Sequence, residues 1–364
     1  MRGLVIDRRG VVAGLAMAAA WAPASAGDAA WRKLPTEPYR GKQDDIAFGS
    51  VNRGWYGNGE GRIFRTDDGG DSWRQVWRKE GTFVRALGFL DAEVGIMGNV
   101  GVGAFPNVTD EAPLYRTSDG GLSWNPVTAI DGPAPGGICG IEVARFPVID
   151  RGERGEQVVV HAAGRVGGPA HYLRSLDRGI SWTSRDLGGL TAAIYDVKFS
   201  SPRIGFIAGS SSPDLAQARG LILRTDDGGD SWREVFRSAR PVETVWKLHF
   251  PTPAVGYGTI QSYDPDPAQV RRFIVRSDDG GDTWRELPLV DNAAWRSFGI
   301  GFADARRGWV GGNLGGLETR DGGETWSPVE FGKAVNKIRI VRQPGGGARV
   351  YAIGVEVHRL ELSA

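Results

Sequence analysis

The 364-residue sequence has a single cysteine, Cys139, and only four histidines. One cysteine excludes an internal disulfide. His161, His171, His249 and His358 are spread through the sequence without the spacing of a metal site. No Gly-x-Gly-x-x-Gly run follows an expected strand and opens a helix, so a dinucleotide site has no support. We therefore expect no metal and no cofactor, and stability must come from the packed core.

An excess of charge of one sign is also missing. The chain has 44 Lys and Arg against 43 Asp and Glu, so it lacks the basic surplus that a nucleic-acid partner requires. After residue 26 no apolar run approaches the roughly 20 residues of a membrane-spanning helix. Helical periodicity is weak over the same part of the chain, which favours an all-β fold.

The N-terminus has the pattern of an export signal. Arg2, Arg8 and Arg9 precede an apolar run from Gly10 to Ala22, and Ala24-Ser25-Ala26 fits a small-x-small cleavage site. We predict a signal peptide over residues 1–26 and a location in the periplasm, or in the thylakoid lumen of a photosynthetic host. Arg8-Arg9 leaves the twin-arginine and the general secretory routes open. Cleavage would remove three arginines and one aspartate and leave 41 basic and 42 acidic side chains.

What the sequence has in abundance is glycine, at 55 residues, and tryptophan, at 13. Both recur in one motif, [Ser/Thr]-x-Asp-x-Gly-x-[Ser/Thr]-Trp, which occurs six times. Its Asp and Trp residues are Asp68 and Trp73, Asp119 and Trp124, Asp177 and Trp182, Asp227 and Trp232, Asp279 and Trp284, and Asp321 and Trp326. The glycines permit a tight turn between two strands, the Asp can accept backbone N–H bonds within it, and the Trp can bury its ring. We expect these residues to be structural, not catalytic. The runs lack the Gly and Glu positions of an EF-hand.

The motif closely resembles the Asp-box, or bacterial neuraminidase repeat. Successive motif tryptophans are 51, 58, 50, 52 and 42 residues apart, the length of a four-stranded propeller blade. Three further strands follow the sixth motif, and Trp31-Arg32-Lys33-Leu34 resembles the strand that follows each motif. We therefore predict a single seven-bladed β-propeller over residues 27–364, in which the N-terminal strand completes the last blade and closes the ring.

The loop pattern predicts where such a propeller would bind a partner. The longer loops, 98–113, 164–170, 210–219 and 261–272, follow the second strands and share one face. Eight residues at its mouth or in its loops are the candidate partner-binding set: Tyr195, Asp196, Trp246, Lys247, Arg271, Arg272, Trp295 and Arg296. Charged residues of the innermost strands are expected along the central channel: Asp45, Glu142, Asp196, Lys198, Lys247, His249, Lys337 and Arg339. Solvated loops and a solvated channel wall remain the alternatives.

An arginine precedes the Ser or Thr of five motifs, at positions 65, 116, 174, 224 and 276, and Gly308-Trp309-Val310-Gly311 typifies a Gly-aromatic second strand. This arrangement resembles the photosystem II stability and assembly factor family. The resemblance implies an exported, monomeric, non-catalytic propeller that binds a protein, such as a subunit of a membrane complex. Fold transfers better than role between propellers of this kind.

The alternative is a glycoside hydrolase, because Asp-boxes also occur in sialidases and β-glucan-cleaving propellers. Such an enzyme needs two carboxylates about 5–9.5 Å apart, or a Tyr nucleophile. The candidates are Asp45, Asp196, Glu243, Asp264 and Tyr195. The Phe-Arg-Ile-Pro segment of sialidases is absent before the first motif, where Arg62-Ile63-Phe64-Arg65 stands instead.

Overall fold

The computed structural model describes residues 30–150, 153–264, 266, 268 and 270–364. The predicted signal peptide, residues 1–26, lies outside this part of the chain. The described residues form β-strands, and among them no helix is long and apolar enough to cross a membrane.

The strands form seven sheets, which we number as blades in chain order. Blade 1 contains β2 (Gln43–Phe48), β3 (Gly54–Asn58), β4 (Arg62–Thr66) and β5 (Arg74–Arg78), and blade 2 contains β6 (Val84–Phe89), β7 (Gly95–Asn99), β8 (Leu114–Thr117) and β9 (Asn125–Pro126). Blade 3 contains β10 (Ile130–Asp131), β11 (Gly140–Asp150), β12 (Glu153–Gly164), β13 (His171–Ser175) and β14 (Trp182–Asp186). Blade 4 contains β15 (Ala193–Phe199), β16 (Gly205–Ser210), β17 (Gly220–Thr225) and β18 (Arg233–Arg237).

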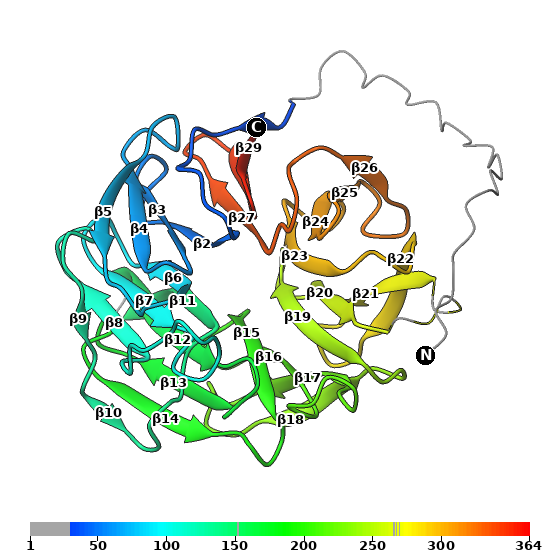
Figure 1. Cartoon of the computed structure of the whole chain (residues 1–364), viewed down its shortest axis with the longest axis horizontal. Coiled ribbons are helices and arrows are strands. Elements are labelled where there is room, and N and C mark those ends of the chain that lie inside the picture. The colour runs from blue at the N-terminus through cyan, green and yellow to red at the C-terminus, as the bar shows by residue number, and fades with distance from the viewer. Residues whose placement is uncertain (1–29, 151–152, 265, 267, 269) are drawn as a thin grey trace, which may run out of the picture.

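Blades 5 to 7 complete the set. Blade 5 contains β19 (Glu243–His249), β20 (Gly256–Ser262), β21 (Arg271–Ser277) and β22 (Arg285–Asp291), and blade 6 contains β23 (Ser297–Phe302), β24 (Gly308–Gly312), β25 (Gly316–Thr319) and β26 (Ser327–Val329). Blade 7 contains β27 (Lys337–Arg342), β28 (Ala348–Ile353), β29 (Val357–Leu362) and the N-terminal β1 (Arg32–Lys33). The first strands of successive blades contact one another around the axis, and β27 contacts β2, so the ring is closed (Figure 1).

The ring closes through the N-terminal strand, as predicted. β1 pairs antiparallel with β29, with Arg32 opposite Arg359 and Lys33 opposite His358. The N–H of Leu34 then donates to the carbonyl of Val357, and the Leu34 side chain is buried against blades 1 and 7. Two distant ends of the described chain therefore share one sheet, in which the short β1 covers the edge of β29.

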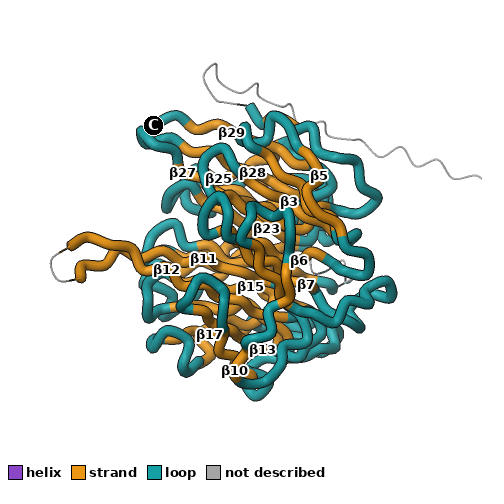
Figure 2. The backbone as a smooth tube through the Cα atoms, turned by 90° about the vertical axis from the view of Figure 1, so that its left-hand side faces the viewer, coloured by secondary structure: helices purple, strands orange, loops and turns teal. Residues whose placement is uncertain are grey.

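Blade 3 departs from the four-strand pattern that the motif spacing suggests. β10 adds a fifth strand, parallel to β14. β11 and β12, of 11 and 12 residues, pair along their whole length, but β13 covers only the Val160–Gly164 end of β12. The rest of the β11–β12 hairpin projects beyond the propeller body (Figure 2). The repeat pattern did not predict this extension, which lies in the turn after the first strand of blade 3 and not in its motif turn.

The six repeated motifs form the turns between the third and fourth strands of blades 1 to 6. In blade 5, Asp279 accepts bonds from the Ser277 hydroxyl at 2.8 Å and from the N–H and hydroxyl of Thr283 at 3.0 and 2.6 Å. Ser277 Oγ accepts the N–H of Gly281 at 2.8 Å. Equivalent bonds to the motif Asp recur in the other five turns. The carboxylates are therefore engaged by their own turns.

The arginine before each of five motifs connects neighbouring blades. Arg224 of blade 4 donates to the Gly280 carbonyl of blade 5 at 2.8 Å, and Arg276 of blade 5 donates to the Gly322 carbonyl of blade 6 at 2.9 Å. Arg65, Arg116 and Arg174 bond in the same way to the next motif turn. Arg359 of blade 7 donates to Gly69 of blade 1 at 2.7 Å, which continues the pattern across the closure.

Aromatic stacking also joins the blades. The second strand of one blade presents a ring to the Phe near the end of the next inner strand. The stacked pairs are Trp55 with Phe89, His161 with Phe199, Phe206 with Phe250, Tyr257 with Phe302, and Tyr351 with Phe48, with ring centroids 3.5, 3.6, 4.4, 3.6 and 4.3 Å apart. The apolar core is therefore distributed between blades.

The hydrogen bonds of the motif turn lead to a pH-dependent prediction. The bonds from Thr283 hold the pKa of Asp279 at about 2, so the folded-state pKa lies below the unfolded value of about 3.9. We expect Asp279→Asn to cost about 1 kcal/mol at pH 7, the usual contribution of such local bonds. Because this stabilisation exists above pH 4 and is lost as the pH falls toward 2, the difference from wild type should shrink over that interval. Urea unfolding midpoints of both proteins at pH 7 and from pH 4 to 2 would measure this difference in stability. An equal deficit of the variant at every pH would contradict the prediction.

Candidate functional site

The two faces of the ring differ in their loops. The first face carries the motif turns and the turns after the first strands. Hydrogen bonds show that these two kinds of turn lie side by side: the Gly228 N–H donates to the Arg203 carbonyl at 2.8 Å, and the Gly322 N–H donates to the Arg306 carbonyl at 2.8 Å. The second face carries the longer connections after the second strands, residues 100–113, 165–170, 211–219 and 263–270. This division agrees with the face expected for partner binding.

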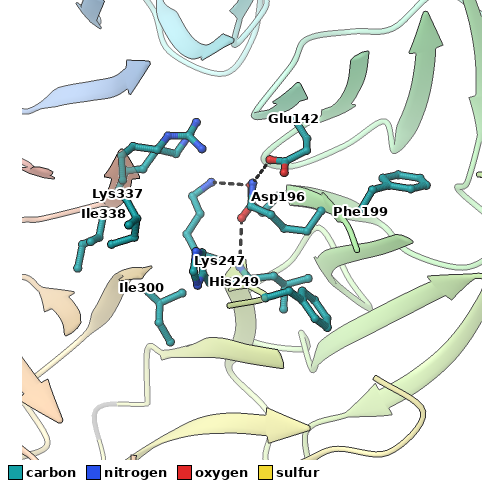
Figure 3. Close-up of a pocket in the computed structure, with 13 residues that line it drawn as sticks. Glu142, Asp196, Phe199, Lys247, His249, Ile300, Lys337 and Ile338 are labelled. Atoms are coloured by element: carbon teal, nitrogen blue, oxygen red, sulfur yellow. Dashed lines mark hydrogen bonds and ion pairs between the residues drawn. The ribbon is translucent and has the colours of Figure 1, made fainter. Parts of the chain in front are cut away.

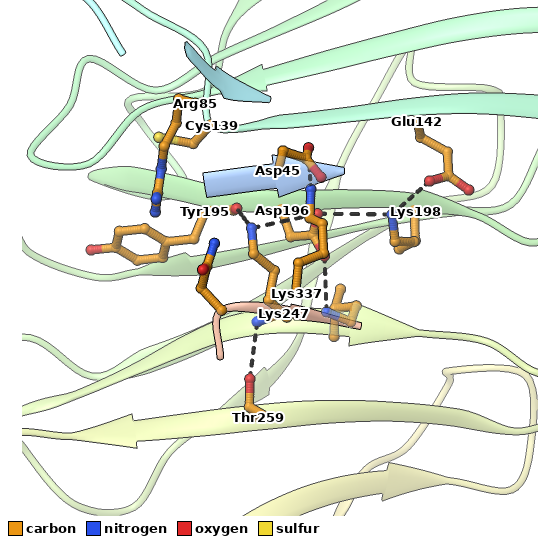
Figure 4. Close-up of polar contacts among 12 residues, drawn as sticks. Asp45, Arg85, Cys139, Glu142, Tyr195, Asp196, Lys198, Lys247, Thr259 and Lys337 are labelled. Carbon is orange, nitrogen blue, oxygen red and sulfur yellow. Dashed lines mark hydrogen bonds and ion pairs between the residues drawn. The ribbon is translucent and has the colours of Figure 1, made fainter. Parts of the chain in front are cut away.

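Four of the eight candidate partner-binding residues lie along the channel, Tyr195 and Trp246 at its second-face end, and all four are buried. Tyr195 stacks on Trp246, with ring centroids 4.7 Å apart, and its hydroxyl pairs with Ser210 Oγ at 3.1 Å. The Arg85 guanidinium lies 5.3 Å from the Trp246 ring. Asp196 and Lys247 lie deeper in the channel (Figure 4). The aromatic pair therefore narrows the channel mouth and leaves little surface for a partner.

The other four candidates divide between buried and exposed positions. Arg272 is buried and donates to the carbonyls of Trp295, at 3.1 Å, and Ala293, while Trp295 packs in the core between blades 5 and 6. Arg271 is exposed and pairs with Asp291 at 3.2 Å. Arg296 is exposed and lies 5.3 Å from the Tyr263 ring. Of the eight candidates, only Arg271 and Arg296 are thus presented to a partner, and the binding role of the set stays a prediction.

The channel wall depends on β-bulges that sequence alternation did not reveal. The register shifts by an extra residue within β2, β6 and β15, at Asp44, Arg85 and Tyr195. A bulge turns a side chain that strict alternation would place elsewhere. Asp44 and Arg85, which were missed as channel residues, are both buried and pair at 2.5 Å. Each bulge lies just before an alternating apolar pair, such as Ile46 and Phe48 in β2 or Val197 and Phe199 in β15, so the alternation of those pairs gave no signal for it.

Asp45 is the most enclosed carboxylate of the channel, with 0% of its surface exposed. It accepts bonds from Lys337 Nζ at 2.5 Å, from Arg339 at 3.4 Å and from the Leu87 N–H at 2.9 Å. Burial alone would raise the pKa of Asp45, but the two cations and the backbone donor lower it. Asp45 is therefore an ionised carboxylate that joins the inner strands of blades 7, 1 and 2.

Asp196 repeats this arrangement on the other side of the channel. Its Oδ2 accepts the N–H of Leu248 at 3.1 Å, and its Oδ1 lies 3.8 Å from both Lys198 Nζ and Lys247 Nζ. Lys198 also bonds to Glu142 at 2.5 Å (Figure 4). Glu142 and Asp196 both face the pocket drawn in Figure 3. Burial raises the pKa of Asp196, but Lys198 and Lys247 outweigh it and lower that pKa to about 2. The channel charges predicted from the inner strands are thus brought together.

His249 adds a neutral donor to the same wall. Its Nδ1 accepts the Phe302 N–H at 3.2 Å, so in the neutral ring Nε2 carries the hydrogen. Burial, followed by the nearby Lys198 and Arg339, lowers the pKa of His249 to about 3. At neutral pH this histidine is uncharged.

These side chains enclose a cavity of about 220 Å³ in the channel, lined by Glu142, Asp196, Lys198, Lys247, His249, Lys337 and Arg339 among others. It adjoins a wider funnel of about 710 Å³ that opens on the first face. Arg145 and Arg342 line the funnel, and Glu142 and Arg339 line both spaces.

Each carboxylate considered for glycan hydrolysis is already engaged by neighbouring groups. Asp45 and Asp196 are each bound by cations. Glu243 pairs with Arg240 at 2.7 Å, and burial raises its pKa. Asp264 lies in the loop after β20 and caps the Asp266 N–H at 2.9 Å. The geometry presents two cation-neutralised carboxylates in the channel, without a free acid and base pair among the candidates.

Metal ligands are not clustered in the described part of the chain, where no three His, Cys, Asp or Glu side chains are arranged to hold an ion. Cys139 is buried, and its Sγ accepts the Val166 N–H at 3.4 Å. His161 bonds to the Tyr172 hydroxyl at 2.7 Å and stacks on Phe199. These side chains pack the structure.

Comparison of the sequence with known proteins finds distant relatives, and no protein-family model matches it. The chain is 26% identical over 268 residues to the photosystem II assembly lipoprotein Ycf48 of Synechococcus sp. (strain CC9902), which covers 63% of this chain and 73% of the relative. It is 23% identical over 336 residues to the chloroplastic photosystem II stability/assembly factor HCF136 of Cyanidioschyzon merolae (strain NIES-3377 / 10D), covering 78% and 72%.

Solved structures share the architecture. A YCF48 structure bound to a D1 peptide has a TM-score of 0.63 at 17% identity and covers 93% of this chain and 96% of that one. A GH74 xyloglucanase from Xanthomonas campestris has a TM-score of 0.62 at 13% identity, covering 91% of this chain and 53% of that one. At these identities the structural likeness concerns fold alone. The chain is a β-propeller whose sequence relatives include photosystem II assembly factors.

Proposed function

We propose that this protein is an exported, non-catalytic propeller that binds another protein and assists the assembly of a membrane complex. The observation that carries the proposal is the sequence similarity to Ycf48 and HCF136, which spans most of the propeller. The related fold of YCF48 bound to a D1 peptide supports a protein as the partner. In this proposal residues 1–26 direct export and the six motif turns are Asp-boxes that serve the scaffold.

The second face is the proposed partner surface. It carries the long loops, and Arg271 and Arg296 are the exposed cations among the candidates (side chain of Arg271 62% exposed). Arginines near an aromatic ring are frequent interface anchors, and Arg296 lies against Tyr263. The six buried candidates would act indirectly, by supporting the loops and the channel mouth.

An affinity experiment tests this proposal. The chain without residues 1–26 would be immobilised, exposed to envelope extract of the host, and compared with Arg271→Glu/Arg296→Glu. We expect a membrane-complex subunit to be retained in stoichiometric amount by the wild type and about tenfold less by the charge-reversed variant, because reversed charges oppose the partner surface.

The matched control is Arg203→Glu/Arg306→Glu, which reverses two exposed arginines on the first face. This control should retain the partner as the wild type does. Equal loss in both variants would remove the second face from the proposal. Cleavage or retention of a glycan in place of a protein would instead favour the hydrolase alternative, for which the GH74 likeness supports the fold only.

A further inference from the structure

The channel contains a repeated pairing of one buried aspartate with two cations. Asp44 lies 2.8 Å from Lys42 and 2.5 Å from Arg85, Asp45 is bound by Lys337 and Arg339, and Asp196 lies between Lys198 and Lys247. Glu142 is the one additional carboxylate and shares Lys198. We call these ten residues the channel cluster: Lys42, Asp44, Asp45, Arg85, Glu142, Asp196, Lys198, Lys247, Lys337 and Arg339.

The channel cluster has an excess of positive charge. Six cations face four carboxylates, and the side chains of all six cations are less than a third exposed. Removing a charge from water is costly unless a partner of opposite sign compensates it. Two cationic side chains of the cluster therefore have no carboxylate of their own, and burial lowers the pKa of Lys42, Lys247 and Lys337 accordingly.

Part of this excess faces the cavity, and the rest lies with Lys42 and Arg85, which share Asp44 away from the cavity wall. Lys198, Lys247, Lys337 and Arg339 line the cavity, against the carboxylates of Glu142 and Asp196. His249 adds its Nε2–H, because Nδ1 is already an acceptor for Phe302. Asp45, behind the wall, is occupied by Lys337, Arg339 and two backbone N–H groups. Lys247 Nζ donates to the Tyr195 carbonyl at 2.6 Å and Lys198 Nζ donates to Glu142, but each ammonium group carries further N–H donors. The wall therefore offers ammonium and imidazole donors, together with one buried acceptor that makes no hydrogen bond, Asp196 Oδ1.

We propose that this cavity binds a small dianion, an oxyanion such as phosphate or a small dicarboxylate, which compensates the positive charge of the cavity wall and of the channel cluster around it. At about 30 Å³ per water, a cavity of about 220 Å³ has room for about seven waters, enough for such an ion with part of its hydration shell. The ion enters through the first-face funnel, where Arg342 extends the positive potential outward and Arg145 is paired with Glu156. The second-face mouth is narrowed by Tyr195 and Trp246.

Calorimetric titration of the mature protein with phosphate, sulfate and succinate, in a chloride background of constant ionic strength, tests the site. We expect the titration to show one ion bound per chain. In thermal unfolding, we expect the dianion to raise Tm, and chloride carrying the same total charge not to raise it. The preference among the three ions distinguishes a tetrahedral oxyanion from a dicarboxylate. Saturation absent at millimolar dianion, or stabilisation equal to that by chloride, would overturn the proposal.

Variants that change the charge excess in both directions make the test independent of folding defects. Lys198→Met lowers the excess from two to one and should weaken binding about tenfold. Glu142→Gln raises it to three and should tighten binding by a similar factor, a gain that misfolding cannot imitate. Lys198→Met/Glu142→Gln restores the excess of two and should recover most of the affinity. Arg306→Met, outside the channel, should leave the affinity unchanged.

The position of the ion can be observed directly. A crystal soaked in selenate, the anomalous scatterer equivalent to sulfate, should show its strongest selenium peak among Lys198, Lys247, Lys337 and Arg339. A strongest peak elsewhere, or unchanged binding by Lys198→Met and Glu142→Gln, would refute the assignment. Because this readout does not involve a protein partner, its failure leaves the proposed assembly role untouched.

Discussion

A chain that begins at Pro35 is expected to be less stable to unfolding by about 4–8 kcal/mol than a chain that begins at Ala30. The five residues between these starts include β1, which completes blade 7 through its pairing with β29. They also include Leu34, 1% exposed, and Trp31, which packs edge-on against Trp309 and Phe331 at 5.8 and 4.8 Å. Loss of a buried Leu alone costs about 2–5 kcal/mol, and the exposed edge of β29 adds to it.

Guanidinium denaturation followed by tryptophan fluorescence would compare the two chains. Leu34→Ala in the chain that begins at Ala30 is the graded control, with an expected cost of about 2–5 kcal/mol. The shortened chain should also aggregate more readily, because β29 becomes an open edge strand. If the two chains unfold at the same denaturant concentration, the N-terminal strand does not hold the ring closed.

Lys337→Met is expected to destabilise the protein by about 3–5 kcal/mol at pH 7, since it leaves the fully buried Asp45 carboxylate with Arg339 as its only cation. Asp45→Asn/Lys337→Met should cost less than the sum of the two single changes, by about 1 kcal/mol or more, because the residues are in direct contact. Arg306→Met, on the exposed first face, should change stability by less than about 0.5 kcal/mol.

The deficit of Lys337→Met should depend on pH. The pKa of Asp45 is lowered in the folded protein, so its charge stabilises the fold above the unfolded pKa of about 3.9 and this contribution is lost as the pH falls below it. In the variant the pKa of Asp45 rises, and protonation removes the poorly paired charge. The gap from wild type should therefore be full above about pH 5 and narrow in acid, as urea midpoints would show. A constant gap would indicate lost packing of the lysine side chain instead.

The propeller and its closure could be predicted because both depend on local chemistry that repeats. Motif tryptophans such as Trp232 and Trp284 are one blade length apart, which predicted the blades. The glycines of the motif predicted a turn with positive φ, and Gly228 and Gly280 have φ of 78° and 74°. The likeness of Trp31-Arg32-Lys33-Leu34 to the post-motif strand predicted its place beside the last blade. The β11–β12 hairpin was missed because its projecting end is a local extension of one blade outside the repeat.

The candidate partner residues were harder to predict because exposure is set by neighbours from other blades. Tyr195 and Trp246 are aromatic residues at a channel mouth, which the sequence indicated, but they stack on each other and are buried. Arg272 was expected at the end of a charged loop, but it lies in β21, where carbonyls from the loop after β22 enclose its guanidinium. Arg271, its neighbour in the chain, points to solvent because side chains alternate along a strand.

The sequence by itself determined the repeat, the strand order within each blade, the ring closure and the identity of most charges on the inner strands, because each follows from period, turn chemistry and alternation. Only the tertiary structure decided which charges meet. Asp45 and Lys337 are 292 residues apart, and Asp196 and Lys247 belong to different blades. β-Bulges bring Asp44 and Arg85 into the same channel. Blade 7 supplies Lys337 and Arg339, but only the closed ring brings them against Asp45 of blade 1 and beside the cations of blades 2, 4 and 5.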